Sequence, residues 1–386
     1  MSNIINIIYK YVYDILYSKS ENIVPYNFII KPTKIQYYNT NELSIYGKYN
    51  NVSAWQGISY LGNSVYLICG TSKPNPQNGN GIIFVGSIDC EDGRTFMLNV
   101  PNPYIEDNYY HTSVYGPNYN SNSGLYTFVG SYTMTNFITK KTTTNGFIYR
   151  GGLNSIALNT TSNFYYLPKT LIKNYDITFL HSFSGNHFVG NSMNSETNKS
   201  VSYLCEFLPI LTDGEPIYIK FPSAITTSSY GIWYNKNNEY TIVGGYSGEH
   251  HKGYGFIVDY NTMTKMFTNW TTVQYPENAN FITHLQGIEL IKFGVYSIIA
   301  DVINTEKNIK TGYYLTIERN NVIERSSKSN GFIIHDNWIN INYPSTDEFT
   351  TSNSVANNCV VGLFISKDGN NESFQASIEL DSSVDI

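Results

Sequence analysis

The sequence predicts an all-β protein built from a repeated unit, and both composition and spacing support this prediction. Aromatic residues make up 15% of the 386 residues, with 35 Tyr, and Tyr, Phe, Ile, Val and Thr favour half-buried strands. Short apolar runs, each closing on a small residue, recur along the chain. They end at Gly70, Gly130, Gly190, Gly245, Ala300 and Gly362, at intervals of 60, 60, 55, 55 and 62 residues. Such regular spacing indicates an internal repeat.

Each repeat holds three or four strand patterns. A polar–aromatic segment such as TSSYGIW precedes the apolar run, a second apolar segment such as GFIVDYN follows it, and several units add a fourth stretch such as RTFMLNVP. Pro101, Pro222 and Pro276 close the fourth stretch, where a missing N–H costs little. Four short strands per unit are typical of a β-propeller, here with six blades. A pair of β-sandwiches is the alternative fold, but no linker divides the chain.

The predicted blades lie near residues 49–105, 106–170, 171–223, 224–278, 279–345 and 346–386. The last unit lacks an outer strand, because only DSSVDI follows SFQASIEL. Residues 33–47 precede the first unit and have a strand-like alternating pattern. We expect this strand to pair with the last blade and close the ring, which leaves no exposed sheet edge. The propeller domain then spans residues 21–386.

Residues 1–20 are predicted to form an amphipathic helix. Its apolar face comprises Ile4, Ile5, Ile8, Val12, Ile15 and Leu16, with Ser2 as a cap. The helix could dock on the propeller or join the chain to a partner or a second copy; a membrane-surface role is disfavoured by its few Lys and Arg. The segment resembles neither a secretory signal nor a membrane span. We therefore expect a cytoplasmic or virion location.

Charge and cysteine content exclude several classes of function. A net charge of −6 argues against a nucleic-acid-binding face, which needs concentrated positive charge. The four cysteines are too dispersed for a disulfide scaffold and are expected to be reduced and buried, although Cys69 and Cys90 could pair in an oxidising compartment. No nucleotide-binding or hydrolase motif occurs, and sialidase-type arginines and Asp boxes are missing, so no cofactor is expected.

One aligned column places hydroxyl residues on the innermost strand of every unit. Its members are Ser53, Thr112, Thr178, Thr227, Thr283 and Thr351. Three residues further on, the column reads Gln56, Tyr115, His181, Tyr230, Gln286 and Ser354. Because innermost strands line the channel of a propeller, these side chains could hold waters, an ion or a polyol. Alternatively, the hydroxyls tie neighbouring blades together by bonding to backbone groups.

Residues that break the repeat are the candidates for chemistry. His181 and His284 stand at channel positions, with Tyr115 and Tyr230 as neighbours, although each His could equally be a hydrogen-bonded interior residue. A hairpin loop, GEHHKG, carries the potential metal ligands Glu249, His250 and His251. Adjacent His in an extended loop usually point apart, so a solvated loop is the alternative there.

The units YTIVGGYS…GYGFIVDYN and THLQGIEL resemble a poorly characterised propeller-repeat family of bacteria and large DNA viruses of protists, over roughly residues 50–385. The Asn-, Ile- and Tyr-rich composition is similar to that of giant-virus proteins. This resemblance implies a fold and no activity.

We therefore expect a non-enzymatic binding or structural module, a virion component that contacts protein partners through its N-terminal helix and Tyr-rich loops. One alternative is a carbohydrate- or lactone-directed hydrolase or lyase that uses His181 or His284 at the channel mouth. The other is a glycan-binding lectin, in which aromatic rings stack on sugars.

Overall fold

The structure, a computed structural model, describes residues 32–39, 52–75, 78–88, 93–101, 107–136, 138–157, 161–167, 175–197, 199–208, 214–248, 253–276, 280–292, 294–328, 332–334, 337–344 and 349–380. Strands dominate this part of the chain, which confirms the predicted all-β class. The predicted helix over residues 1–20, the loop residues Glu249, His250 and His251, and Cys90 lie outside the described residues. No described helix is long and apolar enough to cross a membrane.

The strands form successive antiparallel meanders that follow the expected repeat units. The first unit comprises β2 (Val52–Gly62), β3 (Val65–Asn75), β4 (Asn78–Ser87) and β5 (Gly93–Met97). The second comprises β6 (Asp107–Asn120), β7 (Leu125–Asn136), β8 (Thr142–Gly151) and β9 (Phe164–Tyr166), with the short helices α2 (Leu153–Ala157) and η3 (Thr161–Asn163) before β9. The third comprises β10 (Ile177–Ser184), β11 (His187–Met193), β12 (Ser200–Glu206) and β13 (Ile217–Ile219).

The remaining units repeat this order. The fourth comprises β14 (Thr226–Tyr234), β15 (Glu239–Ser247), β16 (Gly253–Asn261) and β17 (Met266–Gln274). The fifth comprises β18 (Phe281–Lys292), β19 (Val295–Asn304), β20 (Ile309–Glu318) and, after helix α4 (Arg319–Lys328), β22 (Ile339–Asn340). The sixth comprises β23 (Thr350–Ala356), β24 (Cys359–Ile365) and β25 (Asn371–Leu380).

β1 (Pro32–Asn39) and β21 (Phe332–Ile334) each lie in a sheet other than the one that their place in the chain suggests. β1 is the fourth strand of the sixth unit's sheet and pairs antiparallel with β25, with Tyr37 opposite Ala376. Residues 40–47 of the expected strand lie outside the described part. β21 falls within the bounds expected for the fifth unit, but it pairs in parallel with β17 of the fourth.

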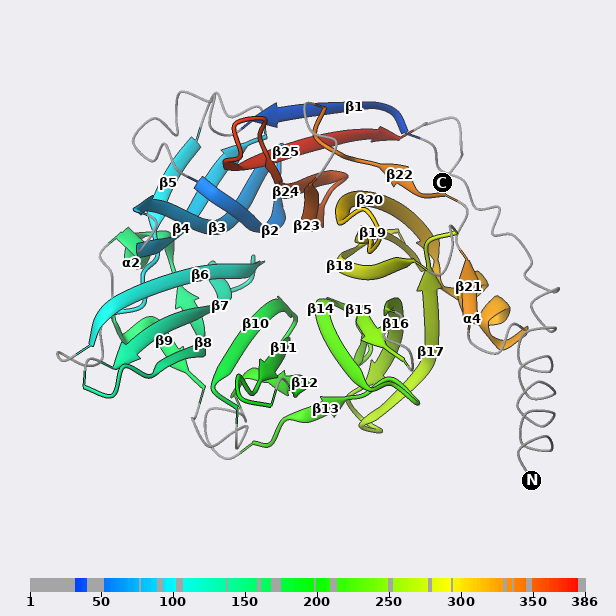
Figure 1. The fold of residues 1–386 in the computed structure, drawn as a ribbon, viewed down its shortest axis with the longest axis horizontal. Helices are drawn as coiled ribbons and strands as arrows, with labels where there is room; N and C mark the ends of the chain where they lie inside the picture. Colours follow the sequence, from blue (N-terminus) through cyan, green and yellow to red (C-terminus); the bar gives the residue numbers. More distant parts are fainter. Residues whose placement is uncertain are drawn as a thin grey trace.

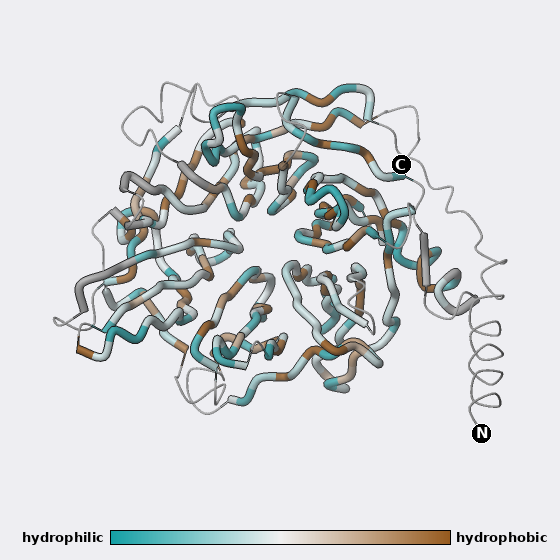
Figure 2. The backbone as a smooth tube through the Cα atoms, viewed as in Figure 1, coloured by the Kyte–Doolittle hydropathy of each residue, from teal (hydrophilic) through white to brown (hydrophobic). Residues whose placement is uncertain are grey.

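The units are arranged as a ring, with β2, β6, β10, β14, β18 and β23 nearest its middle (Figure 1). Hydrophobic segments recur in every sheet around this ring (Figure 2). A separate apolar cluster lies at each junction, such as Val243 of β15 with Leu285 of β18, and Trp55 of β2 with Val361 of β24. The core therefore lies between neighbouring sheets, including the junction of the sixth unit with the first. This is a β-propeller-like all-β fold.

The innermost strand explains why a small residue marks each repeat. A Cβ on Gly130 would collide with the carbonyl oxygen of Ser113 on β6. In the fourth unit, a Cβ on Gly244 would collide in the same way with Ser228 on β14. The equivalent glycine there is therefore Gly244, and the sequence alignment on Gly245 was wrong by one residue.

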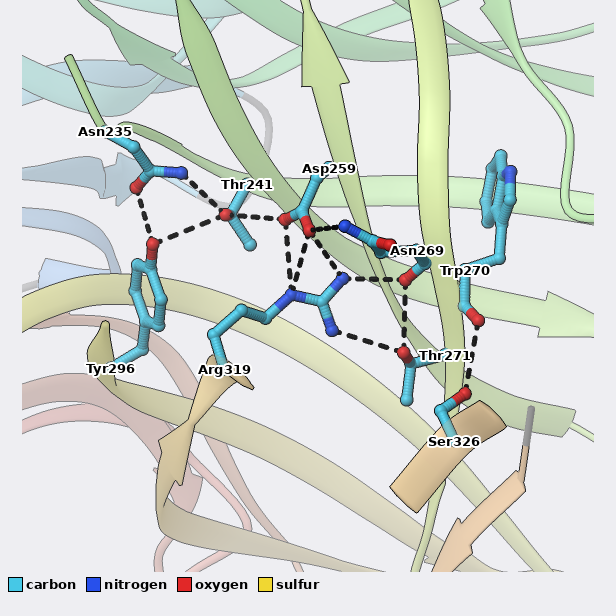
Figure 3. Close-up of polar contacts among 9 residues, drawn as sticks. All are labelled: Asn235, Thr241, Asp259, Asn269, Trp270, Thr271, Tyr296, Arg319 and Ser326. Carbon is cyan, nitrogen blue, oxygen red and sulfur yellow. Dashed lines mark hydrogen bonds and ion pairs between the residues drawn. The ribbon is translucent and has the colours of Figure 1, made fainter. Parts of the chain in front are cut away.

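A buried polar network joins the fourth unit to the fifth (Figure 3). Arg319, 5% exposed at the start of α4, donates from Nη2 to Asp259 Oδ2 at 3.0 Å and to the Asn269 carbonyl oxygen at 2.7 Å. Asp259 also accepts from Thr241, which bonds to Asn235. Asn235 directly follows the last residue of β14, so this network helps to hold the turn at the end of that strand.

Candidate ligand-binding site

Three residues of the hydroxyl column tie neighbouring units together. Thr112, Thr227 and Thr283 are buried, and each hydroxyl accepts a hydrogen bond from the backbone at the end of the preceding unit. The donors are the N–H groups of Val100, Phe221 and Tyr275, at 3.3, 3.1 and 3.2 Å, and each directly precedes one of the closing prolines. Of the two alternatives for this column, backbone bridging is therefore the one observed.

The other members of this column differ in detail. Thr178 bonds across its own unit to β11 at 2.9 Å, and the side chain of Ser53 lies outside the described part. In the sixth unit the equivalent residue is Thr350, whose hydroxyl accepts from Tyr343 N at 3.4 Å. The alignment on Thr351 was wrong by one residue, because two threonines are adjacent there.

Three residues beyond each hydroxyl, the innermost strand is irregular. In five units the ladder between the first two strands skips one residue, as between Leu180 and Ser182; in the second unit the shift falls between Tyr115 and Asn118. A bulge re-aims the side chain it carries. The residues at this position, here called the bulge ring, are Gln56, Tyr115, His181, Tyr230, Gln286 and Asn353. Asn353 takes the place that the sequence alignment assigned to Ser354.

A cavity of about 330 Å³, here called the funnel, opens from the bulge ring toward the turns between the first and second strands. Its wall includes five members of the ring: Gln56, His181, Tyr230, Gln286 and Asn353. Small residues follow the ring positions and let the inner strands approach closely. A Cβ on Gly231, for example, would lie only 3.2 Å from the Gly287 Cα. All six units therefore contribute to one funnel.

Four aromatic rings form a continuous arc beside the funnel. His181 lies between Tyr115 and Tyr230, with ring centroids 5.5 and 5.1 Å away and edge-on geometry. Tyr230 also contacts His284, at 6.0 Å. The structure thus brings together all four candidates for chemistry from the sequence. Tyr230 lies against both imidazoles, so they do not converge on a common reacting centre.

Burial keeps this arc uncharged. It lowers the pKa of His181 to about 4, and burial together with the positive charge of Lys310 lowers the pKa of His284 to about 4. Burial raises the pKa of Tyr115 and Tyr230. At neutral pH the arc therefore presents neutral imidazole and phenol groups, which both donate and accept hydrogen bonds.

The amides of the bulge ring have different partners. Gln286 Nε2 donates to buried Asp301 Oδ2 at 3.1 Å, which leaves its carbonyl oxygen as an acceptor for a ligand. Asn353 Nδ2 donates to the Trp55 carbonyl oxygen at 2.6 Å across the junction of the sixth and first units. Within the bulge ring, Gln56 and Gln286 are therefore the amides suited to ligand contact. The Asn353 amide instead stabilises the junction through its bond to Trp55.

Glu289, which the sequence pattern did not single out, is the only acidic residue among the described residues that line the funnel. It lies six residues beyond the hydroxyl of its unit, a column occupied in the other units by Ser59, Asn118, Ser184, Trp233 and Ala356. Extending the alignment by three more residues would have shown that Glu289 is the only acidic residue in this column. Its pKa is raised by burial to about 7.

Tyrosines recur at the rim of the funnel. Tyr60, Tyr119 and Tyr234 line it in three different units. Each contacts the tyrosine opposite on the second strand, with centroids 5.1, 4.8 and 4.9 Å apart, from Tyr66, Tyr126 and Tyr240 respectively. Tyr60 and Tyr234 are 38% and 37% exposed. Part of each ring is therefore accessible to a ligand at the rim.

No protein-family model matches the chain, and no curated protein matches its sequence. Its fold is similar to that of a protein of unknown function from Dyadobacter fermentans, with a TM-score of 0.55, 9% identity, and 91% of this chain and 99% of the other covered. An alpha-L-arabinanase from Penicillium chrysogenum has a TM-score of 0.45 at 10% identity, covering 91% and 98%.

The Aleuria aurantia lectin has a TM-score of 0.44 at 9% identity, covering 84% of this chain and 94% of the lectin. At such identities the likeness concerns the fold alone. The bacterial or viral origin expected from the sequence stays a prediction.

Proposed function

We propose that the chain is a six-bladed β-propeller, with β1 completing the last blade, and that it binds a carbohydrate in the funnel without transforming it. The observation that carries the proposal is the composition of the funnel wall. Neutral aromatic rings from several units stand beside side-chain amides, with one ionisable carboxyl group.

Sugars match this chemistry. Their hydroxyl groups both donate and accept, as do the amide of Gln56 and the neutral imidazole of His181. Their apolar faces stack on aromatic rings, which Tyr60 and Tyr234 offer at the rim. Recurrence of this tyrosine in three units supports contact with a repeating or extended ligand.

Hydrolysis of a glycosidic bond is less well supported. Most glycoside hydrolases use two carboxyl groups that flank the bond, whereas Glu289 is the only acid among the described lining residues. His181 and His284 are separated by Tyr230 and do not act on one centre. A binding role therefore fits the site better than catalysis.

The test is a glycan-array screen of the full chain, followed by calorimetric titration of the best ligand. Tyr234→Ala should weaken binding roughly tenfold, since one lost aromatic contact of about 1.4 kcal/mol corresponds to that factor. Tyr218→Ala is the matched control, because Tyr218 is 54% exposed on β13 and does not line the funnel.

Equal affinity losses in the two variants, or no ligand at all, would contradict the proposal. Mass spectrometry of the ligand after incubation separates binding from cleavage.

A separate proposal, which rests on the composition of the chain, is that the protein belongs to a large virion and makes contacts through residues 1–20 and the Tyr-rich loops. Locating the native protein by mass spectrometry tests it.

A further inference from the structure

Glu289 is placed where a ligand in the funnel would meet it. It lies on β18, three residues beyond Gln286 of the bulge ring, and both residues belong to the funnel wall. Glu289 Oε2 accepts a hydrogen bond from the backbone N–H of Asn357, in the turn between β23 and β24. This bond holds the carboxyl group in place between the fifth and sixth units.

Within the described part of the chain, the surroundings of Glu289 supply no counter-ion. None of the described residues that line the funnel is Lys or Arg, and no ion pair joins Glu289 to another described residue. The titratable groups packed near it are Tyr314 of β20 and Cys359 of β24, and burial raises the pKa of both. Both neighbours are therefore neutral at physiological pH.

A carboxyl group without a cation, in a partly desolvated aromatic cavity, attracts a positively charged ligand in two ways. Coulomb attraction to a carboxylate is stronger where water is excluded. Aromatic faces add cation–π attraction for an ammonium group, and Tyr60, Tyr119, Trp233 and Tyr234 belong to the same wall. Ammonium binding would also restore the ionised state of Glu289, whose pKa burial raises to about 7.

We propose that the funnel prefers a glycan that carries free amino groups, with Glu289 as the counter-ion of one ammonium group. This inference rests on the proposed carbohydrate binding and names the class of sugar. It assigns to Glu289 a role in selectivity, whereas the aromatic rim supplies affinity common to all sugars.

Calorimetry of the full chain with three tetrasaccharides tests the inference: β-1,4-linked glucosamine, its N-acetylated counterpart, and glucose. The wild type should bind the glucosamine tetramer at least roughly tenfold more tightly than the other two. Glu289→Gln should abolish this preference, so that the three tetramers bind with affinities within about twofold of one another. Free lysine serves as the ammonium ligand without a sugar and should bind far more weakly than the glucosamine tetramer.

A second measurement needs no variant. Because Glu289 becomes ionised as the pH rises toward about 7, affinity for the glucosamine tetramer should rise roughly tenfold from pH 5 to pH 7, while affinity for the glucose tetramer stays flat. Equal affinities of the wild type for all three tetramers would overturn the amine preference and leave carbohydrate binding intact. Free lysine that binds as tightly as the glucosamine tetramer would also overturn the inference. Absence of binding to every sugar, in this assay and on the array, would overturn the proposed function itself.

Discussion

Replacing Arg319 by Met would remove the guanidinium group that joins the fifth unit to β16 and β17 of the fourth (Figure 3). Nε of Arg319 donates to both carboxylate oxygens of Asp259 at 3.2 Å, and Nη1 donates to Thr271 Oγ1 at 3.2 Å. The side chains of Arg319 and Asp259 are 6% and 19% exposed. The substitution keeps most of the side-chain volume, so its main effect is to leave Asp259 without its cation.

Breaking a buried ion pair from one side costs about 3–5 kcal/mol, because the remaining charge stays desolvated. Asp259 retains hydrogen bonds from Thr241 and Asn269, both at 2.9 Å, and some contact with solvent. We therefore expect the lower end of this range, a loss of about 3 kcal/mol in the free energy of unfolding. Asn269 has a φ of 56°, and the loss of the bond from Arg319 to its carbonyl oxygen removes one restraint on that conformation.

Urea denaturation followed by Trp fluorescence measures this loss as a shift in midpoint at unchanged slope. The matched control is Lys34→Met, since the Lys34–Glu379 pair is 4.0 Å apart with both side chains about 60% exposed; it should cost less than about 1 kcal/mol. Adding Asp259→Asn to Arg319→Met should recover part of the loss, because it removes the unpaired charge. If Arg319→Met is no more destabilising than Lys34→Met, the network does not hold the two units together.

Gly244→Ala should lower the free energy of unfolding by about 1–3 kcal/mol, because the new Cβ would collide with the Ser228 carbonyl oxygen. Gly152→Ala should be nearly neutral, because nothing lies near the position of its Cβ. The melting temperatures of the two variants compare these effects. Because burial depresses the pKa of His181 from 6.5 to about 4, the unfolded state binds more protons, so stability should fall as the pH drops from about 6.5 to 4. His181→Gln should reduce that dependence in urea melts without abolishing it, because His284 has a similarly depressed pKa, and an unchanged slope would exclude His181 as a source. Asn353→Ala removes the hydrogen bond to the Trp55 carbonyl oxygen and should lower the free energy of unfolding by about 1 kcal/mol. Limited proteolysis of this variant should cut first near β1 and β2. First cleavage elsewhere would contradict the prediction.

Local rules explain how far the sequence could predict the fold. A small residue recurs because the innermost strand passes close beside it, as Ser113 of β6 does at Gly130. The proline-closed segments recur because the residue before each proline donates its N–H to a hydroxyl of the next unit, as Val100 does to Thr112. Both constraints act between residues close together in the repeat, so they leave a periodic trace in the chain.

The same local rules left a one-residue ambiguity wherever the sequence doubles a residue. Two glycines at positions 244 and 245, and two threonines at 350 and 351, fit the pattern equally well. Only the pairing of the strands decides between them, because the ladder shows Gly244 opposite Ser229 and Thr350 opposite Phe364.

The site itself depends on contacts between units. The hydroxyl column could be read as channel-lining or as bridging, and only the positions of the neighbouring backbone N–H groups identify it as bridging. Tyr115, His181, Tyr230 and His284 are separated by 49 or more residues from one neighbour to the next, yet the ring of sheets brings them into one arc.

Glu289 illustrates the limit most clearly. From sequence alone, a glutamate near a turn cannot be distinguished from a solvent-exposed surface charge. Its burial, its bond to Asn357 and its place in the funnel wall follow from the packing of the fifth unit against the sixth. Repeat geometry is local and visible in the chain, whereas the environment of a side chain is set by segments that meet only when the ring is assembled.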